Sequence, residues 1–461
     1  MLRLYMMDRK LRGRERWNRE RLLRYQQEAL QRLREFAYAK SPFYRWFHDG
    51  LFDSPIQELP ILTKTKLMEN WNEVVTDRNL TLDQVKNYLA QDDWSTLLRG
   101  KYYVNMTSGT TGLRGIFVYD TSEWLSTLAG ASRNRGWAGA PARLTKAFKQ
   151  AWVTTVHPWH QTALMGATTQ SRISPSLRVD STEPMNDLVS KLNAFQPEVL
   201  FTYPSMAKQL AHSQLAGELK IAPKVVTTGA EPLTGDVREA VVRAWGVMTF
   251  DSYGGTECAA WAGECSEHRG LHVHEDRVVA EFVDQHNNPV APGQYGAKVL
   301  ITVLSTRTLP LIRYELNDSV QPSKDICPCG RPFALLNGVQ GRLEEVIHMT
   351  GQSVENVAVQ PLFFQVVMEK LEADGWQVFQ VTKSNLRVSI LHPAAGFDEV
   401  RFKGSLIRGL TVQGVASPSI EVDFPTALKT NPIGKVFLIK ALVTQSAEDS
   451  SRRDSQASSL T

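Results

Sequence analysis

The sequence predicts an α/β protein with a large N-terminal domain of mainly parallel sheets plus antiparallel strands, followed by a small α+β C-terminal domain. Between residues 100 and 320, short apolar runs alternate with helical patterns, as expected for a mainly parallel sheet. Residues 278–304 have the pattern of antiparallel strands, with a hairpin turn at 284–289. After residue 342 the pattern changes, which indicates a second, smaller unit.

Composition is that of an ordinary globular protein. The chain has 461 residues, of which 42% are hydrophobic and 22% charged, enough for a large domain and a smaller one. No run approaches the roughly 20 apolar residues that span a bilayer, so we expect a cytoplasmic protein. The net charge of +4 comes with a basic excess in the first 35 residues, which a solvated helix face explains better than nucleic-acid or membrane binding.

The N-terminal segment is predicted to be helical. Residues 16–40 place apolar side chains at helical spacing among charged ones, which indicates an amphipathic helix. Pro42 ends this pattern and leads into a second short helix. Thr63 is suited to cap a further helix.

The central apolar runs are predicted to be strands, at residues 102–104, 116–119, 153–156, 199–202, 224–227 and 247–250. Residues 187–195 and 236–245 have helical patterns between them. The carboxyl ends of parallel strands form the ligand crevice of such a sheet. The turn-forming segments 203–205, 228–232 and 251–257 are therefore expected on one rim.

The C-terminal part is predicted to contain two helices and two strands. The helices are expected at 357–371 and 397–410, and the strands at 377–381 and 386–391. The last segment, 446–461, has almost nothing to bury, so we expect a disordered tail.

Residues 107–115 place glycines and hydroxyl side chains in a turn between two strand-like runs. Glycine lets consecutive backbone N–H groups converge on an anion, and Ser and Thr hydroxyls add donors for phosphate oxygens. A polyphosphate-binding loop is one interpretation, and an ordinary hairpin turn is the other. A mononucleotide P-loop is excluded, because the stretch lacks the Lys-Ser/Thr pair and a following helix.

Three of the four cysteines and one histidine have the stoichiometry of a structural Zn²⁺ site. The set consists of Cys265, His272, Cys327 and Cys329. His268 and His274 are rival ligands, and buried free thiols are the alternative to a metal. A catalytic metal is disfavoured because no open coordination position is evident.

Several motifs resemble those of the adenylate-forming superfamily, the acyl-CoA synthetases and their relatives. Residues 107–112 resemble its Thr-Ser-Gly-Thr-Thr-Gly loop, with Arg114 and Gly115 in place of the final Pro-Lys. Residues 253–257 resemble its Tyr-Gly-x-Thr-Glu motif. The segments 41–45 and 310–318 resemble the phenylacetate-CoA ligase and CapK-like branch, and this resemblance extends over residues 16–445.

The resemblance implies a nucleotide site with catalytic residues. It assigns the ring of Tyr253 to adenine, Thr256 to phosphate, Glu257 to Mg²⁺ and Asp318 to the ribose hydroxyls. Lys435 is implied to stabilise the charge that builds as a carboxylate attacks ATP, so the catalytic set is Lys435, Glu257 and Thr256. The implied ATP and AMP contacts are Thr107, Ser108, Gly109, Thr110, Thr111, Gly112, Arg114, Gly229, Ala230, Glu231, Asp251, Ser252, Tyr253, Gly254, Asp318 and Arg342.

The resemblance also sets domain boundaries. A large adenylate-forming domain is expected over 1–341, with a helical opening at 1–75 and an ATP-binding core at 100–341. A hinge at 342–345, with Glu344 as pivot, joins it to a small mobile lid domain at 346–445. Residues 351–353 read Gly-Gln-Ser, which departs from the family pattern near the thioester-forming site.

The implied function is ATP-dependent activation of a carboxylic acid as acyl-adenylate, followed by acyl transfer. CoA is the favoured acceptor and co-substrate, while an amine, a carrier protein or another acceptor stays an alternative. A nucleotide-binding zinc scaffold without catalysis is a further alternative. His157, Trp159 and Tyr203 are candidates for an acyl pocket that suits a small aromatic acid, or else they are core residues. ATP, Mg²⁺ and structural Zn²⁺ are the expected cofactors, and a homodimer is one oligomeric state left open.

Overall fold

The structure is a computed structural model that describes residues 2–91, 96–107, 113–141, 148–170, 175–181, 183–230, 233, 235–341, 347–352, 355–359, 361–368, 371, 373–426, 429 and 439–442. The described residues up to 341 form one compact unit, and those from 347 onward form a second. The predicted α/β class is confirmed, since a large sheet carries parallel and antiparallel strands between helices. None of the described helices is long and apolar enough to cross a membrane.

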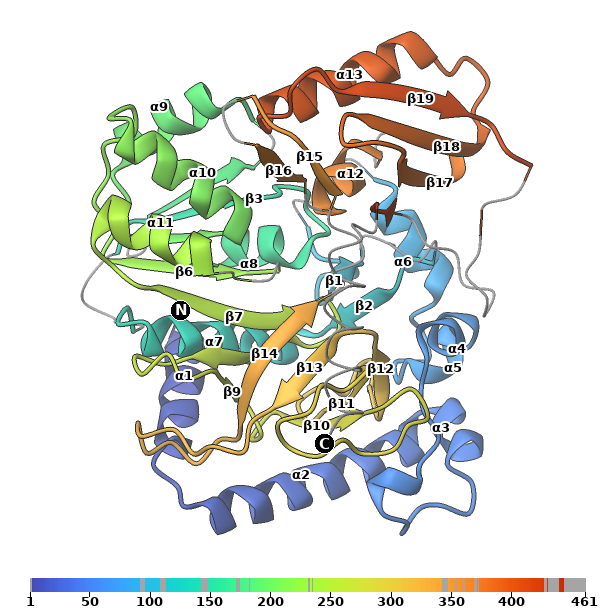
Figure 1. Ribbon diagram of the computed structural model, residues 1–461. Helices are drawn as coiled ribbons and strands as arrows, with labels where there is room; N and C mark the ends of the chain where they lie inside the picture. The colour runs from blue at the N-terminus through green and yellow to red at the C-terminus, as the bar shows by residue number, and fades with distance from the viewer. Residues whose placement is uncertain are drawn as a thin grey trace, which may run out of the picture. The chain divides into compact units, whose positions relative to one another are not determined.

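One large sheet positions most of the site residues (Figure 1). Its described strands, from edge to edge, are β13 (Ser319–Pro322), β14 (Leu335–Gly341), β9 (Leu271–Val273), β8 (Ala259–Glu264), β7 (Thr249–Gly255), β6 (Val225–Gly229), β5 (Val199–Thr202), β3 (Gln150–Thr154) and β4 (Ser176–Asp180). From β4 to β7 neighbouring strands are parallel, and from β7 to β13 they are antiparallel. Strand β7 is therefore the boundary between the two halves.

Two smaller sheets complete the first unit. The hairpin β1 (Tyr103–Met106) and β2 (Ile116–Tyr119) pairs Met106 with Ile116, next to the predicted phosphate loop. Strands β10 (Val278–Val283), β11 (Lys298–Val303) and β12 (Tyr314–Leu316) form an antiparallel sheet. One hydrophobic core contains side chains from both sheets and from the N-terminal helices, including Trp71, Phe117 and Tyr314.

The helices of the first unit cover these sheets. The N-terminal ones are α1 (Leu2–Arg14), α2 (Arg19–Lys40), α3 (Pro42–Phe47), the 3₁₀ helix η1 (Ile56–Glu58), α4 (Lys64–Glu69), α5 (Trp71–Val74) and α6 (Leu82–Leu89). The sheet helices are α7 (Thr121–Trp137), α8 (Gln161–Thr169), α9 (Met185–Phe195), α10 (Pro204–Leu215) and α11 (Gly235–Trp245). Figure 1 shows α10 and α11 side by side against the parallel half of the sheet, whereas α7 runs along β7 and β8 with α1 packed on it.

The second unit is α+β, as predicted. Its sheet has the order β19 (Ser419–Asp423), β18 (Asn385–Pro393), β17 (Ala373–Gln380), β20 (Ile439–Lys440), and a separate hairpin joins β15 (Ile347–Thr350) to β16 (Asn356–Val359). Helices α12 (Pro361–Met368) and α13 (Glu399–Val412) contribute Phe364, Leu406 and Leu410 to a core of their own. This core satisfies the requirement that each unit bury its own apolar face.

Most predicted elements occur, and two expectations are wrong in detail. The cap at Thr63 forms, since its side chain accepts a hydrogen bond from the backbone N–H of Lys66. Residues 2–14 form a helix, which lies within the predicted helical opening. Residues 356–359 are a strand rather than the start of a helix. Residues 251–255 lie within β7 rather than in a loop, because their backbone pairs with β8.

Candidate active site

The predicted phosphate loop is closed at its base by two hydrogen bonds. The backbone N–H of Thr107 donates to the carbonyl of Gly115 at 2.9 Å, and the N–H of Gly115 donates to Oγ1 of Thr107 at 2.7 Å. The predicted contacts Ser108, Gly109, Thr110, Thr111 and Gly112 lie outside the described residues. The closure continues the β1–β2 ladder and fixes where the loop leaves and rejoins the hairpin.

Arg114 lies beside an aromatic segment next to this hairpin. Its guanidinium carbon is 5.6 Å from the ring centre of Trp159, within the range of a cation–π contact. The backbone of Trp159 accepts a hydrogen bond from Met106 at 3.0 Å, so the segment is fixed to the end of β1. The Trp159 ring stacks on His160 at 4.5 Å and lies 5.3 Å from the ring of His157.

Two of the predicted nucleotide residues bond each other directly. The hydroxyl of Tyr253, on β7, donates to Oδ2 of Asp318 at 2.8 Å. The ring of Tyr253 packs against Trp261 with 4.7 Å between centres. Burial, with the Asp318 carboxylate beside it, raises the pKa of Tyr253 well above its usual value, so the phenol stays protonated and donates.

Tyr119 joins the loop hairpin to the Thr256–Glu257 segment. Its hydroxyl donates to the carbonyl of Thr256 at 2.8 Å and lies 3.1 Å from that of Glu257. Nε2 of Gln161 also donates to the Thr256 carbonyl, at 3.3 Å. Sequence reasoning missed Tyr119, although its place at the end of the strand after the loop could have indicated it.

The rim between β6 and β7 is tightly packed. Gly229 lies opposite Ser252, and a Cβ on Gly229 would lie 2.7 Å from the Ser252 carbonyl oxygen. The next residue, Ala230, has a left-handed backbone with φ of 69°. Glu231, predicted with them, lies outside the described residues. The structure thus brings Gly229, Ala230 and Ser252 together at the rim.

Asp251 is a partly buried acid at the same rim. Burial, followed by the nearby Glu264 carboxylate, raises the pKa of Asp251 to about 7. Glu264 accepts the backbone N–H of Asp251 at 2.9 Å and is paired with Arg238 at 2.5 Å. Asp251 itself accepts the N–H of Ser252 at 2.9 Å. Near neutral pH its carboxyl can therefore accept or donate a hydrogen bond.

The acyl-pocket candidates differ in their surroundings. Tyr203 is buried, and its hydroxyl accepts the backbone N–H of Thr155 at 3.0 Å, as a core residue would. Trp159 is 8% exposed, whereas His157 is half-buried. Trp159 and His157 lie in the segment beside Arg114.

The four predicted metal ligands come together. The ligand atoms of Cys265, His272, Cys327 and Cys329 all lie within 4.8 Å of one another. Cys265 Sγ is 3.7 Å from Cys327 Sγ, and Cys329 Sγ is 3.3 Å from His272 Nε2. Burial lowers the pKa of His272 to about 4, so its imidazole is neutral, as a ligand must be.

The rival histidines have other partners. His268 Nδ1 lies 3.4 Å from a Glu264 carboxylate oxygen, and the His268 ring packs on Phe250. His274 Nε2 lies 2.9 Å from Oδ1 of Asn134. Of the three histidines considered from the sequence, only His272 lies in the thiol cluster.

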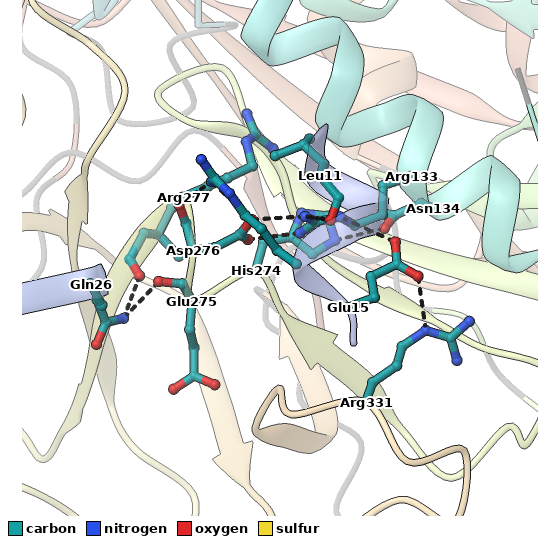
Figure 2. Close-up of polar contacts among 12 residues, drawn as sticks. Leu11, Glu15, Gln26, Arg133, Asn134, His274, Glu275, Asp276, Arg277 and Arg331 are labelled. Atoms are coloured by element: carbon teal, nitrogen blue, oxygen red, sulfur yellow. Dashed lines mark hydrogen bonds and ion pairs between the residues drawn. The ribbon is translucent and has the colours of Figure 1, made fainter. Parts of the chain in front are cut away.

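A buried ionic centre lies between α1, α7 and β10 (Figure 2). Asp276 accepts two hydrogen bonds from Arg133, both at 2.8 Å, and one from Arg14 at 3.2 Å. Burial raises the pKa of Asp276, but the two arginines outweigh it and hold that pKa well below its usual range. Glu15 lies 3.6 Å from Arg133 and 3.5 Å from Arg331, which extends the centre toward the cysteine cluster.

Comparison with known proteins places the chain in a family. The family model of the AMP-binding enzymes matches residues 68–300, more than half of the chain, so the chain belongs to this family. The phenylacetate-coenzyme A ligase of Thermus thermophilus is 26% identical over 362 residues, which cover 76% of each chain. The phenylacetate-coenzyme A ligase of Escherichia coli is 26% identical over 340 residues, covering 69% of this chain and 70% of that protein. The resemblance to this branch is thereby confirmed.

A solved structure shares the fold. A 2-hydroxyisobutyryl-CoA ligase, crystallised with 2-HIB-AMP and CoA in the thioesterification state, aligns with a TM-score of 0.63 at 18% identity. The alignment covers 96% of this chain and 94% of that one. Arg342, Glu344 and Lys435 lie outside the described residues, so their assigned roles stay predictions.

Proposed function

We propose that the chain is an AMP-forming ligase that activates a carboxylic acid as its acyl-adenylate and then passes the acyl group to CoA. The main observation behind the proposal is that the loop hairpin β1–β2 contacts the carboxyl end of β7. Tyr119 bonds the Thr256 carbonyl, and Tyr253 bonds Asp318, so the predicted phosphate, adenine and ribose residues form one connected region. Membership of the AMP-binding family also supports the proposal that the chain is an AMP-forming ligase.

The first step needs charge stabilisation on the phosphates. Glu257 is 8% exposed and would hold Mg²⁺, a hard cation that prefers carboxylate and phosphate oxygens. Thr107, on the loop hairpin, and Arg114, just after the predicted loop, would meet the phosphates, while Tyr253 and Asp318 would hold the nucleoside. Forming an adenylate first divides one difficult condensation into two easier steps.

The second step and the acid follow from the relatives. The related phenylacetate-CoA ligases use CoA, which supports CoA as acceptor. Their name also supports a small aromatic acid, with Trp159 and His157 lining its site. A domain rotation at Glu344 would separate the two steps.

We also propose that Cys265, His272, Cys327 and Cys329 hold structural Zn²⁺. Three thiols and one neutral imidazole within 4.8 Å are a fitting donor set, and three of the four residues are buried. Bound zinc would supply a tetrahedral crosslink between β9, the end of β8 and the 327–329 turn. Zinc analysis of protein purified without chelator should give about one equivalent, and less than about half an equivalent would contradict the site.

ATP–pyrophosphate exchange with a panel of carboxylic acids tests the main proposal. We expect exchange with at least one small acid, strongest for aromatic acids, and an acyl-CoA product by mass analysis when CoA is added. Lys435→Ala should abolish exchange but spare transfer from a preformed acyl-adenylate. ATP binding without exchange on any acid would refute the enzyme and favour the zinc scaffold.

Arg114 can be tested by a matched pair of variants. Arg114→Ala should raise KM for ATP about tenfold, because one charge-assisted contact to phosphate is lost. Arg114→Lys keeps the charge and should recover part of the loss. Equal effects of the two substitutions would show that packing on Trp159, not charge on phosphate, is the role of this side chain.

A further inference from the structure

We propose that Asn134 is a positioning residue for the nucleotide site, acting through Ser252 on β7. The inference rests on the proposed function, since it assigns to Asn134 the task of fixing the strand that carries Tyr253. Asn134 lies on α7, far from the motifs in sequence, and its side chain is buried.

The amide of Asn134 joins three elements. Its Nδ2 donates to Oγ of Ser252 at 2.8 Å and to the carbonyl of Ala262 at 3.0 Å. Its Oδ1 lies 2.9 Å from Nε2 of His274 (Figure 2). One side chain thereby connects β7, β8 and the residue that follows β9.

These contacts fix the orientation of the amide. A backbone carbonyl can only accept, so the nitrogen of Asn134 must face Ala262 and its oxygen must face His274. His274 must therefore carry its proton on Nε2. Each polar group of the Asn134 amide has a partner, which defines a single arrangement.

Local sterics at Gly263 depend on this amide. Gly263 lies opposite Ser252 in the β7–β8 register, and a Cβ on Gly263 would lie 2.3 Å from Oδ1 of Asn134. The amide thus sits directly over the Ser252–Gly263 pair. On the other edge of β7 the Ser252 carbonyl is in close approach to Gly229. A shift of Ser252 would therefore change the rim where adenine is proposed to bind.

Helix α7 is itself anchored at both ends. At its start, Asp120 and Glu123 form a capping box, and Glu123 also accepts the backbone N–H of Thr308 at 2.7 Å. Near its end, Arg133 makes the paired bonds to Asp276. The residue beside Arg133 is Asn134, so the amide is presented from a helix that cannot easily slide.

Three variants test the proposal in the full-length protein. Asn134→Ala removes the bridge, and Gly263→Ala displaces the amide without changing an implied nucleotide contact, because its Cβ would lie 2.3 Å from Oδ1 of Asn134. Thr168→Val is the matched control, because it removes the hydrogen bond from Trp124 of the same helix without touching β7. The measurements are ATP affinity by titration calorimetry, KM for ATP and for the acid in pyrophosphate exchange, and thermal melting.

We expect Asn134→Ala to raise both the ATP dissociation constant and KM for ATP about tenfold, with kcat and KM for the acid within about twofold of the unchanged protein. Gly263→Ala should move the same quantities by about threefold. Thr168→Val should leave them unchanged while lowering the melting temperature.

Unchanged ATP affinity in Asn134→Ala and Gly263→Ala, or an equal change in Thr168→Val, would overturn the positioning role. If Asn134→Ala fails to fold, Gly263→Ala decides. Calorimetry measures ATP binding without turnover, so it separates the two proposals. If the unchanged protein bound ATP but exchanged no pyrophosphate, the proposed ligase activity would fail. Weaker ATP binding in the variants would still support the positioning role.

Discussion

Asp251 and Asp276 are two enclosed carboxyl groups of the first unit, and their pKa values move in opposite directions. Around Asp251, burial and the Glu264 carboxylate raise the pKa to about 7. Around Asp276, burial acts in the same sense, but Arg133 and Arg14 reverse it. Desolvation favours the neutral acid in both places, so the partners decide the outcome.

The difference distinguishes a structural carboxylate, that of Asp276, from the carboxyl group of Asp251, which lies at the proposed ligand site. Asp276 accepts three hydrogen bonds from arginines, and these engage both of its carboxylate oxygens. Asp251 accepts a hydrogen bond from the neighbouring backbone N–H of Ser252, and it lies at the proposed adenine rim. In a nucleotide site, some hydrogen-bonding groups must be available to the ligand, whereas in a structural centre the hydrogen-bonding groups bond one another.

The largest effect is expected from Asp276→Asn. The substitution removes the carboxylate charge that Arg14 and Arg133 share and leaves Arg133 dependent on Glu15 at 3.6 Å. Breaking a buried ion pair typically costs about 3–5 kcal/mol. Urea unfolding monitored by tryptophan fluorescence should therefore show a strongly lowered midpoint. Arg14→Met is the comparison variant and should cost less, because Arg133 still pairs with Asp276. A loss below about 1 kcal/mol for Asp276→Asn would show that the centre is not structural.

The ionic centre could not be predicted from the sequence. Its members Arg14, Arg133 and Asp276 are 119 or more residues apart in sequence, and no motif links them. The bounds of helix α1, within the predicted helical opening, were not predicted for a different reason. Its buried face contains Asp8 and Arg14 beside Leu4 and Leu11, so apolar periodicity alone does not reveal it.

The fold class and the metal cluster were easier to predict from the sequence. Strands β2 and β5 match the predicted residues because apolar runs bounded by turn residues mark buried strands. Cys265, His272, Cys327 and Cys329 were chosen by ligand chemistry, and the structure brings them together. The contacts within the site could not be predicted from the sequence, because contacts such as that of Tyr119 with Thr256 depend on tertiary packing.

An intermediate effect is expected from Asp251→Asn, and it depends on pH. An unfolded aspartate titrates near 3.9, whereas folded Asp251 titrates near 7, so the folded protein binds the extra proton between these values. Stability from this group is complete below about pH 4 and is lost as the pH rises through 7.

Urea midpoints of nucleotide-free protein at pH 5 and pH 8 measure this contribution. The unchanged protein should lose about 1–3 kcal/mol between these values that Asp251→Asn does not lose. Parallel pH profiles for the two proteins would mean that Asp251 is already ionised at pH 5, and the contrast with Asp276 would disappear.

The smallest effect is expected from Glu421→Gln, which tests pairing without burial. Glu421 on β19 lies opposite Arg387 on β18, 3.2 Å from its guanidinium, and accepts Nδ2 of Asn385 at 2.6 Å. Both charged side chains are nearly half exposed, so water and salt screen the pair. The urea midpoint of Glu421→Gln should therefore match that of the unchanged protein at low and at high salt. If the urea midpoint of Glu421→Gln fell nearly as far as that of Asp276→Asn, an exposed acid–arginine contact would be stabilising by itself. If the midpoint matched that of the unchanged protein, the effect at Asp276 would be due to the burial of its arginines away from water.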